Sequence, residues 1–274
     1  MHHHFKDHFS NDSTAYSQYR PGYPAALFEF LAHSCRSRET AWDCATGSGQ
    51  AALQLAERFN RVIATDASDS QIAAAARHER IDYRVAAAEQ SGLANASIDL
   101  VTVAQALHWF NLAAFFSEVK RVLKPDGIIA VWSYNLLRID PQIDPIIDDL
   151  YQHVLHGFWP AERTRVERGY ADLPFPFEAV ASIPPFSMTA QWDLPRLAGY
   201  LGTWSAVQRM IQETGENPVE RIYPNLLRQW GDPTRQRPVS WPLSIRVGNN
   251  ARCPARQADA NLAAQEGGAL TAAL

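Results

Sequence analysis

Cysteine is scarce in this sequence. Only three of its 274 residues are cysteine, at positions 35, 44 and 253, and none of them forms a C-x-x-C pair. This excludes a disulfide framework and a zinc knuckle, and we expect Cys44 to be a small core residue. The histidine run at residues 2–4 could chelate a metal, but such terminal runs are more often unstructured or added features. The sequence predicts no required metal.

The sequence also lacks a long apolar run and an excess of one charge. No stretch reaches the length of a membrane span, and Met1 is followed by histidines and charged residues rather than by a signal-peptide core. The net charge is -4, with acids and bases interspersed, which predicts no basic face for nucleic acid or membrane. We therefore expect a cytoplasmic protein that acts on a small molecule. Monomer and homodimer are equally compatible with the sequence.

The most informative stretch runs from Trp42 to Gln50, with the sequence WDCATGSGQ. A short apolar segment ends at Asp43, and a tight turn containing Gly47 and Gly49 then opens a helix. Glycine permits a positive φ and lets the backbone approach a ligand, because it has no Cβ. The pattern predicts that a ligand binds across this turn.

The residues after the turn complete a strand, turn, helix and strand unit. The helical segment has a one-sided apolar pattern, formed by Ala52, Leu55, Ala56 and Phe59. Residues 61–66 then read as a buried strand that ends at Asp66. An acid roughly 20 residues past such a turn accepts hydrogen bonds from ribose hydroxyls. The ligand is therefore expected to contain adenosine.

Two features bear on which nucleotide is bound. A nicotinamide fingerprint would have a third glycine where this chain has Ala52, although small residues are tolerated there and the spacing does not exclude a dinucleotide. Asp43 would repel a pyrophosphate but suits a ligand that carries an ammonium and a sulfonium charge. Electrostatics therefore favour S-adenosylmethionine over NAD.

The motif Asp43-x-Ala45-x-Gly47-x-Gly49 resembles the first motif of class I S-adenosylmethionine-dependent methyltransferases, D/E-x-G-x-G-x-G. Ala45 departs from this pattern. The resemblance extends from about Phe5 to Gly248. It is closest to the type 11 branch that includes trans-aconitate methyltransferases, through the strings YRPGYP at residues 19–24 and QALHWF at residues 105–110.

The resemblance implies a set of cofactor-binding residues along the first half of the chain. Asp43 would hold the methionine ammonium, and Asp66 with the adjoining Ala67 would bind the ribose. Adenine would meet the amide of Ala88 and the side chain of Glu89, since Ala87 stands where the family often has an acid. The remaining cofactor-binding positions that it implies are Ala45, Gly47, Gly49, Gln105, Tyr16 and Arg20.

Three of these assignments have a second interpretation. Tyr16 and Arg20 either fold over the methionine end of the cofactor, where a guanidinium suits the carboxylate, or belong to an ordinary surface helix. Glu89 either replaces the missing acid or faces solvent. His108 is the candidate catalytic residue, because a histidine near pKa 6.5 accepts a proton at neutral pH. It could equally be a hydrogen-bonded wall residue, and a carboxylate acceptor would need no base.

Further along, helices and strands alternate as a doubly wound sheet requires. The third and fourth strands are expected at residues 81–86 and 98–104. A turn at residues 125–127 would then lead into a fifth strand at 128–132. A capping box at Ser68 and Gln71 starts the helix after Asp66, and a second helix has its apolar side at Leu112, Phe115, Phe116, Val119 and Leu123.

The later part of the chain departs from this alternation. Residues 134–181 are rich in aromatics and broken by prolines, which indicates an inserted helical cap that roofs the substrate pocket or fills a second small core. A strand at 186–192, a helix at 194–211 and a last strand at 241–247 follow, with Pro242 suited to an edge or bulge. We predict a Rossmann-like doubly wound, mostly parallel seven-stranded α/β sheet with this cap, in one domain over residues 1–248, and a disordered tail at 249–274.

By resemblance, the expected reaction is transfer of the cofactor methyl group to a small-molecule acceptor by in-line displacement, with a carboxylate or another oxygen nucleophile as one candidate acceptor. Such a reaction depends mainly on orientation in a water-poor site. It needs neither a nucleophilic triad nor paired carboxylates, and the sequence has no pattern for them. An NAD(P)-dependent oxidoreductase and a non-catalytic S-adenosylmethionine-binding protein are the alternatives.

Overall fold

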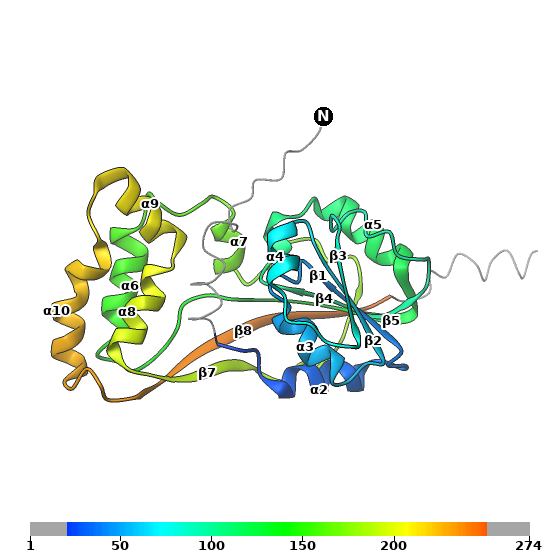
Figure 1. Cartoon of the computed structure of the whole chain (residues 1–274), viewed down its shortest axis with the longest axis horizontal. Helices are drawn as coiled ribbons and strands as arrows, with labels where there is room; N and C mark the ends of the chain where they lie inside the picture. The colour runs from blue at the N-terminus through cyan, green and yellow to red at the C-terminus, as the bar shows by residue number, and fades with distance from the viewer. Residues whose placement is uncertain (1–20, 251–274) are drawn as a thin grey trace, which may run out of the picture.

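The computed structural model describes residues 21–250. Within this range an eight-stranded sheet has the order β3-β2-β1-β4-β5-β8-β6, and β7 also pairs with β8. The strands are β1 (Thr40–Cys44), β2 (Arg61–Asp66), β3 (Ile81–Val85), β4 (Ile98–Ala104), β5 (Leu123–Tyr134), β6 (Glu178–Ala179), β7 (Ser187–Trp192) and β8 (Arg237–Asn249). Figure 1 shows β8 as the long strand that runs out from the sheet toward a group of helices.

Strands β1 to β5 are parallel, whereas β8 runs antiparallel to β5, β6 and β7. From β1 the chain builds outward through β2 and β3, then returns to the other side of β1 with β4 and β5. The order therefore reverses between β1 and β4. In such sheets ligands bind outside the carboxyl ends of the strands at this reversal.

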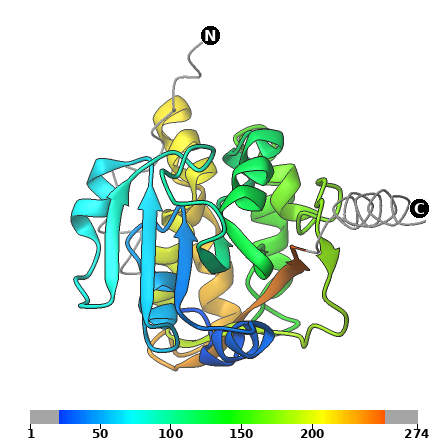
Figure 2. The ribbon, with the colours of Figure 1, turned by 90° about the vertical axis from the view of Figure 1, so that its right-hand side faces the viewer.

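Helices cover both faces of the sheet because the parallel strands are apolar on both faces. Ala41 of β1 packs in one core with α2 (Ala25–Ser34) and α3 (Gln50–Ala56). Trp42 and Cys44 pack in a second core with α5 (Leu112–Val122). In Figure 1, α2 and α3 accordingly lie below the sheet and α5 lies above it. Figure 2, turned by 90°, shows the parallel strands side by side.

The remaining helices form what we call the helical lobe, residues 135–174 and 193–236. It contains α6 (Asp144–Asp149), a π-helical segment (Leu150–Val154), α7 (Arg163–Glu167), α8 (Leu194–Gly202), α9 (Ser205–Thr214) and α10 (Pro218–Trp230). A core that includes Tyr151, Tyr200, Trp204, Trp230 and Trp241 joins α6, the π-helical segment and α8 to α10 to β7 and β8. Helix α7 packs instead beside β5, between the other helices of the lobe and the sheet (Figure 1).

The expected fold class is confirmed, and β2 and β4 have the predicted bounds. Ser68 caps α4 (Asp69–Ala74) as expected, accepting a hydrogen bond from the Gln71 amide. The sheet has one strand more than the seven expected, because the two-residue strand β6 forms inside the segment predicted to be a cap. So short a strand has no alternation that a sequence could display.

Two predictions of local structure were wrong. The helix expected over 194–211 is two helices, because Trp204 adopts an extended conformation between α8 and α9. The turn expected at 125–127 lies inside β5 as an irregular stretch, where Asp126 has φ +64° and the pairing with β4 shifts register after Leu123. Helices α2 and α10 were not anticipated at all.

Pro242 lies in β8, between the stretch paired with Tyr134 and the bridge from Arg138 to Ser240. The amide of the next residue, Leu243, donates to Phe186 on the side of β7, so the Pro242 nitrogen faces the opposite side. There the chain at residues 135–137 has left β8, and the missing N–H interrupts no ladder bond.

None of the helices between residues 21 and 250 is long and apolar enough to cross a membrane.

Candidate functional site

In the turn after β1, every second residue from 45 to 49 has a positive φ. Ala45, Gly47 and Gly49 have φ of +54°, +56° and +87°. Gly49 directly precedes α3, and a Cβ at this position would collide with the hydroxyl of Tyr83 from β3. Gly49 is thus required by its backbone conformation and by close packing. Ala45 adopts the left-handed conformation without the freedom of glycine.

Asp66, at the end of β2, binds this turn directly. Its Oδ2 accepts the Gly47 amide at 2.9 Å, and its Oδ1 accepts the Ser68 amide at 2.9 Å. Ala67, between Asp66 and Ser68, is exposed. A carboxylate has about four lone-pair positions and can accept several hydrogen bonds at once. The structure therefore places the predicted ribose acid against the predicted glycine turn.

Asp43 is buried at the end of β1, with 1% of its surface exposed. The hydroxyls of Thr46 and Thr102 donate to its carboxylate at 2.5 and 2.8 Å. Burial raises the pKa of Asp43 to about 6; the two hydroxyl bonds oppose this rise and the nearby Asp66 charge adds to it. Within residues 21–250 its carboxylate is bonded to hydroxyls rather than to a cation. A cationic ligand group beside it would relieve this cost.

Residues 87–89, after β3, pack against the start of α5. Ala88 is buried in the core shared with α5, whereas Ala87 is exposed and bridges to Gln90. The Glu89 carboxylate accepts the Asn111 amide at 2.8 Å. Glu89 therefore does not simply face solvent, because one of its oxygens is bonded at the end of α5 where a negative charge is favourable.

Gln105 follows β4 with φ +56°, and its side chain contacts the backbone of Tyr134 at the end of β5. The Gln105 Nε2 donates to the Tyr134 carbonyl at 3.1 Å, and its Oε1 accepts the Tyr134 amide at 2.8 Å. The side-chain amide thus ties the carboxyl ends of β4 and β5 together.

His108 lies in a short 3₁₀ turn (Leu107–Trp109) and is buried. Its Nδ1 lies 2.9 Å from the hydroxyl of Tyr170, and its carbonyl accepts a hydrogen bond from Arg165. Burial lowers the pKa of His108 to about 3, and the charges of Arg163 and Arg165 contribute. His108 is therefore neutral at pH 7, and so low a pKa does not favour a role as general base.

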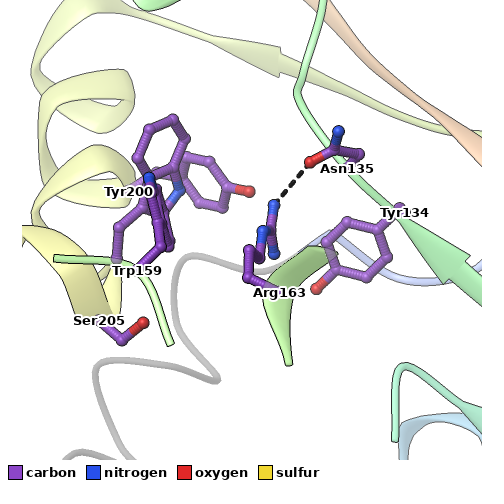
Figure 3. A pocket seen from close by; sticks show the side chains of 7 residues that line it. Tyr134, Asn135, Trp159, Arg163, Tyr200 and Ser205 are labelled. Atoms are coloured by element: carbon purple, nitrogen blue, oxygen red, sulfur yellow. Dashed lines mark hydrogen bonds between the residues drawn. The ribbon is translucent and has the colours of Figure 1, made fainter. Parts of the chain in front are cut away.

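A small cavity lies beyond the end of β5, at the boundary between the sheet and the helical lobe (Figure 3). Its volume is about 70 Å³. The residues that line it are Tyr134, Asn135, Trp159, Arg163, Tyr200, Trp204 and Ser205. Figure 3 shows Arg163 between Tyr134 and Asn135 on one side and Trp159 and Tyr200 on the other.

The candidate residues thus fall into two groups. Asp43, the turn at 45–49 and the segment 66–67 form one group at the ends of β1 and β2. Gln105 and His108 form a second group beside β5, Tyr170 and the cavity. Glu89 lies near the first group, since its charge affects the pKa of Cys44. Tyr16 and Arg20 lie outside the described residues.

Sequence reasoning missed the partners that hold these groups. Thr46 and Thr102 position Asp43, and Tyr170 positions His108. Thr46 lies in the glycine motif and could have been noted there. The Tyr170 contact joins residues 62 positions apart, and no local pattern announces it. Between residues 21 and 250, no three His, Cys, Asp or Glu side chains gather in a group that could hold a metal.

Comparisons with known proteins agree with this geometry. Residues 42–131 match the family model described as "Methyltransferase domain". A Dictyostelium discoideum protein named "Putative methyltransferase" is 33% identical over 230 residues, which cover 82% of this chain and 87% of that protein. A Saccharomyces cerevisiae protein named "Probable S-adenosylmethionine-dependent methyltransferase" is 30% identical over 132 residues, 45% of each chain.

One solved structure is similar over nearly its whole length. It is described as "a Putative Type II Methyltransferase from Anaeromyxobacter dehalogenans" and is 45% identical, with a TM-score of 0.82. The match covers 85% of this chain and 99% of that chain.

Proposed function

Because the chain belongs to the class I S-adenosylmethionine-dependent methyltransferase family, we propose that it transfers the cofactor methyl group to an oxygen nucleophile, such as a carboxylate, on a small molecule. The observation that supports the cofactor part of this proposal is the joint placement of Asp43, Gly47 and Asp66 at the reversal of strand order. Residues 1–248 would form the catalytic domain.

The charges at the end of β1 and β2 fit this cofactor. Burial raises the pKa of Asp43, because its charged form is poorly solvated there. The methionine ammonium would stabilise that charged form. Asp66 would accept the ribose hydroxyls from its place against Gly47 and Ser68, beside Ala67. A diphosphate would meet two carboxylates here, which is unfavourable.

The other assignments are part of the same proposal. Ala45, Gly47 and Gly49 would present their backbone to the cofactor, and the Ala88 amide would meet the adenine ring. Glu89 would add an acceptor for the adenine amine through the lone pairs that the Asn111 amide leaves. Gln105 would act by holding the end of β4 in place, since its side chain is bonded to Tyr134. Tyr16 and Arg20 would cover the methionine end.

When bound, S-adenosylmethionine supplies a sulfonium methyl group, which the acceptor oxygen takes by in-line displacement while the carbon–sulfur bonding pair returns to sulfur. A carboxylate acceptor is already ionised at neutral pH, so no residue needs to remove a proton. His108 therefore has a positioning role in this proposal, consistent with its pKa of about 3 and its bond to Tyr170.

The test is calorimetric titration of wild type and Asp66→Ala with S-adenosylmethionine. Loss of hydrogen bonds to a charged acceptor should cost about 1.5–3 kcal/mol, or roughly 10- to 150-fold in affinity. Asp66 also accepts hydrogen bonds from two backbone amides, so its loss could loosen the turn as well as remove ligand contacts. Asp66→Asn is therefore titrated as well, and the melting temperature of each variant shows whether the turn is loosened.

Asp82→Asn is the matched control, since Asp82 lies near the opposite end of the neighbouring strand β3 and pairs with arginines. It should leave affinity unchanged. Binding of NAD by the wild type, with no heat from S-adenosylmethionine, would instead support the oxidoreductase alternative. Cofactor binding without methyl transfer to any of a panel of carboxylates would support a binding protein.

A further inference from the structure

We propose that the cavity beyond β5 is the acceptor subsite and that Arg163 binds a small, flat monocarboxylate there. This inference rests on the proposed function, because it names the substrate class for that reaction. The subsite is built around one guanidinium, whose position is fixed from several sides.

Four contacts hold the Arg163 guanidinium. It lies over the ring of Tyr151 at 5.3 Å and over the ring of Trp159 at 5.1 Å. Its Nε donates to the Tyr151 hydroxyl, and its Nη2 donates to Asn135 Oδ1, both at 2.7 Å. Figure 3 shows the bond to Asn135. The side chain is therefore preorganised, so that little rotamer entropy is lost when it binds a ligand.

The same contacts leave binding capacity on the guanidinium. In the described part of the chain two of its five N–H groups donate, which leaves three on Nη1 and Nη2. Two adjacent nitrogens in a fixed plane match the two oxygens of a carboxylate. Within residues 21–250 no carboxylate forms an ion pair with Arg163, because Glu167 is bonded to the Tyr151 hydroxyl instead. The charge thus lacks a direct counter-ion in this part of the chain.

The lining of the cavity selects the rest of the ligand. Among the lining residues that the structure describes, Arg163 is the single cation, which favours a ligand with one negative charge. Trp159, Trp204 and Tyr200 supply aromatic walls, with the Trp159 and Trp204 rings 5.7 Å apart and the Tyr200 and Trp204 rings 6.1 Å apart. These rings pack tilted or edge to face against one another, and the aromatic wall that they form favours contact with an aromatic ligand face. The volume of about 70 Å³ accommodates an acid group and its first few atoms.

The cavity is also placed next to the second group of candidate residues. Tyr134 lines it, and the Tyr134 backbone is bonded to Gln105 at the end of β4. Arg165, on the same short helix as Arg163, donates to the His108 carbonyl at 2.9 Å, so this helix packs against the turn that carries His108. A ligand anchored on Arg163 would therefore extend toward the carboxyl end of β4.

The experiment compares binding of three ligands by titration calorimetry. Benzoate is flat and charged, benzamide is flat and neutral, and cyclohexanecarboxylate is charged but puckered. We expect benzoate to bind about 10-fold or more tightly than benzamide, and about 2- to 10-fold more tightly than cyclohexanecarboxylate. Arg163→Gln should reduce benzoate affinity about 10-fold or more.

Arg168→Gln is the matched control, because Arg168 is an exposed arginine that directly follows α7, the helix that carries Arg163, and it pairs with Asp172. It should bind benzoate as the wild type does. If Arg163→Gln does not fold, Ser205→Phe decides the question, since Ser205 is an exposed lining residue and a ring there would obstruct the cavity. It should abolish benzoate binding and keep the affinity for S-adenosylhomocysteine.

Equal affinity of wild type and Arg163→Gln for benzoate would refute the subsite, as would equal affinity for benzoate and benzamide or the absence of benzoate binding. Failure of the proposed function gives a different result. In that case the wild type would not bind S-adenosylhomocysteine, whatever its affinity for benzoate, and the acceptor role of the cavity would be refuted with it.

Discussion

Replacement of Asp43 by asparagine should stabilise the protein while weakening cofactor binding. The carboxylate is buried and bonded to the hydroxyls of Thr46 and Thr102, and its pKa is raised from 3.8 to about 6. At about 1.4 kcal/mol for each pKa unit, the ionised group destabilises the fold at neutral pH by about 3 kcal/mol. Asparagine has nearly the same shape and carries no charge.

The sign of the effect depends on pH. Because the folded-state pKa is raised, the cost of ionising Asp43 is fully present above pH 6. It disappears as the pH falls from about 6 toward 3.8, since the folded protein then takes up the proton more readily than the unfolded chain. Asp43→Asn should therefore raise the melting temperature by about 5–10 °C at pH 7.5. The gain should shrink to almost nothing at pH 4.

The assay is thermal unfolding of wild type and variant between pH 4 and pH 8, with calorimetric titration of S-adenosylmethionine at pH 7.5. Loss of the ammonium contact should weaken binding about 10-fold or more. Asp99→Asn is the matched control: Asp99 is equally buried but pairs with Lys124, so the substitution should lower the melting temperature at pH 7.5. A lower melting temperature for Asp43→Asn at pH 7.5, or unchanged affinity, would refute this reasoning.

Three further predictions concern neighbouring residues. Ala45→Gly should stabilise the protein by about 0.5–1 kcal/mol in denaturant unfolding, because glycine adopts φ +54° without strain; a loss of stability would count against the strained turn. Gly49→Ala should destabilise it by about 1 kcal/mol or more, through the positive φ and the contact with the Tyr83 hydroxyl, and Tyr83→Phe should restore part of that loss; no rescue would show that the backbone alone requires glycine. His108→Asn should change turnover less than about 10-fold with no shift in the pH–rate profile, whereas loss of a titration near neutral pH would restore the general-base interpretation.

Local pattern was enough to identify most strands in the first half of the fold. The apolar run that ends at Asp66 and the run at residues 98–104 are bounded by turns and charges, so their strands could be predicted residue by residue. The capping role of Ser68 likewise depends on residues three positions apart. In each case the information that determines the structure is contained in neighbouring residues.

The helical lobe was harder to predict because contacts distant in the sequence determine it. Trp204 fits a continuous helix by periodicity, but it packs against Tyr151 and Trp159 from the π-helical segment and the loop after it, and the helix is interrupted there. The aromatic residues and prolines after Tyr134 predicted that this segment departs from the alternating pattern, but not which aromatic side chains meet.

The same limit applies to the site. Asp43 and the glycines were recognised because the motif is contiguous, but the pKa of Asp43 depends on burial, on Thr102 from β4 and on Asp66 from β2. His108 was assigned as a candidate base from its ordinary pKa. Burial lowers the pKa of His108 to about 3, and the charges of Arg163 and Arg165 from the helical lobe contribute. The sequence identified His108 as a candidate, but not the burial and the arginine charges that set its pKa.

The most direct test of whether the turn after β1 binds S-adenosylmethionine through Asp66 is calorimetric. Wild type and Asp66→Asn are each titrated with S-adenosylhomocysteine and with NAD. We expect the wild type to bind S-adenosylhomocysteine, Asp66→Asn to bind it about 10-fold or more weakly, and neither protein to bind NAD. Equal affinity of the two proteins for S-adenosylhomocysteine, or binding of NAD in its place, would contradict this expectation.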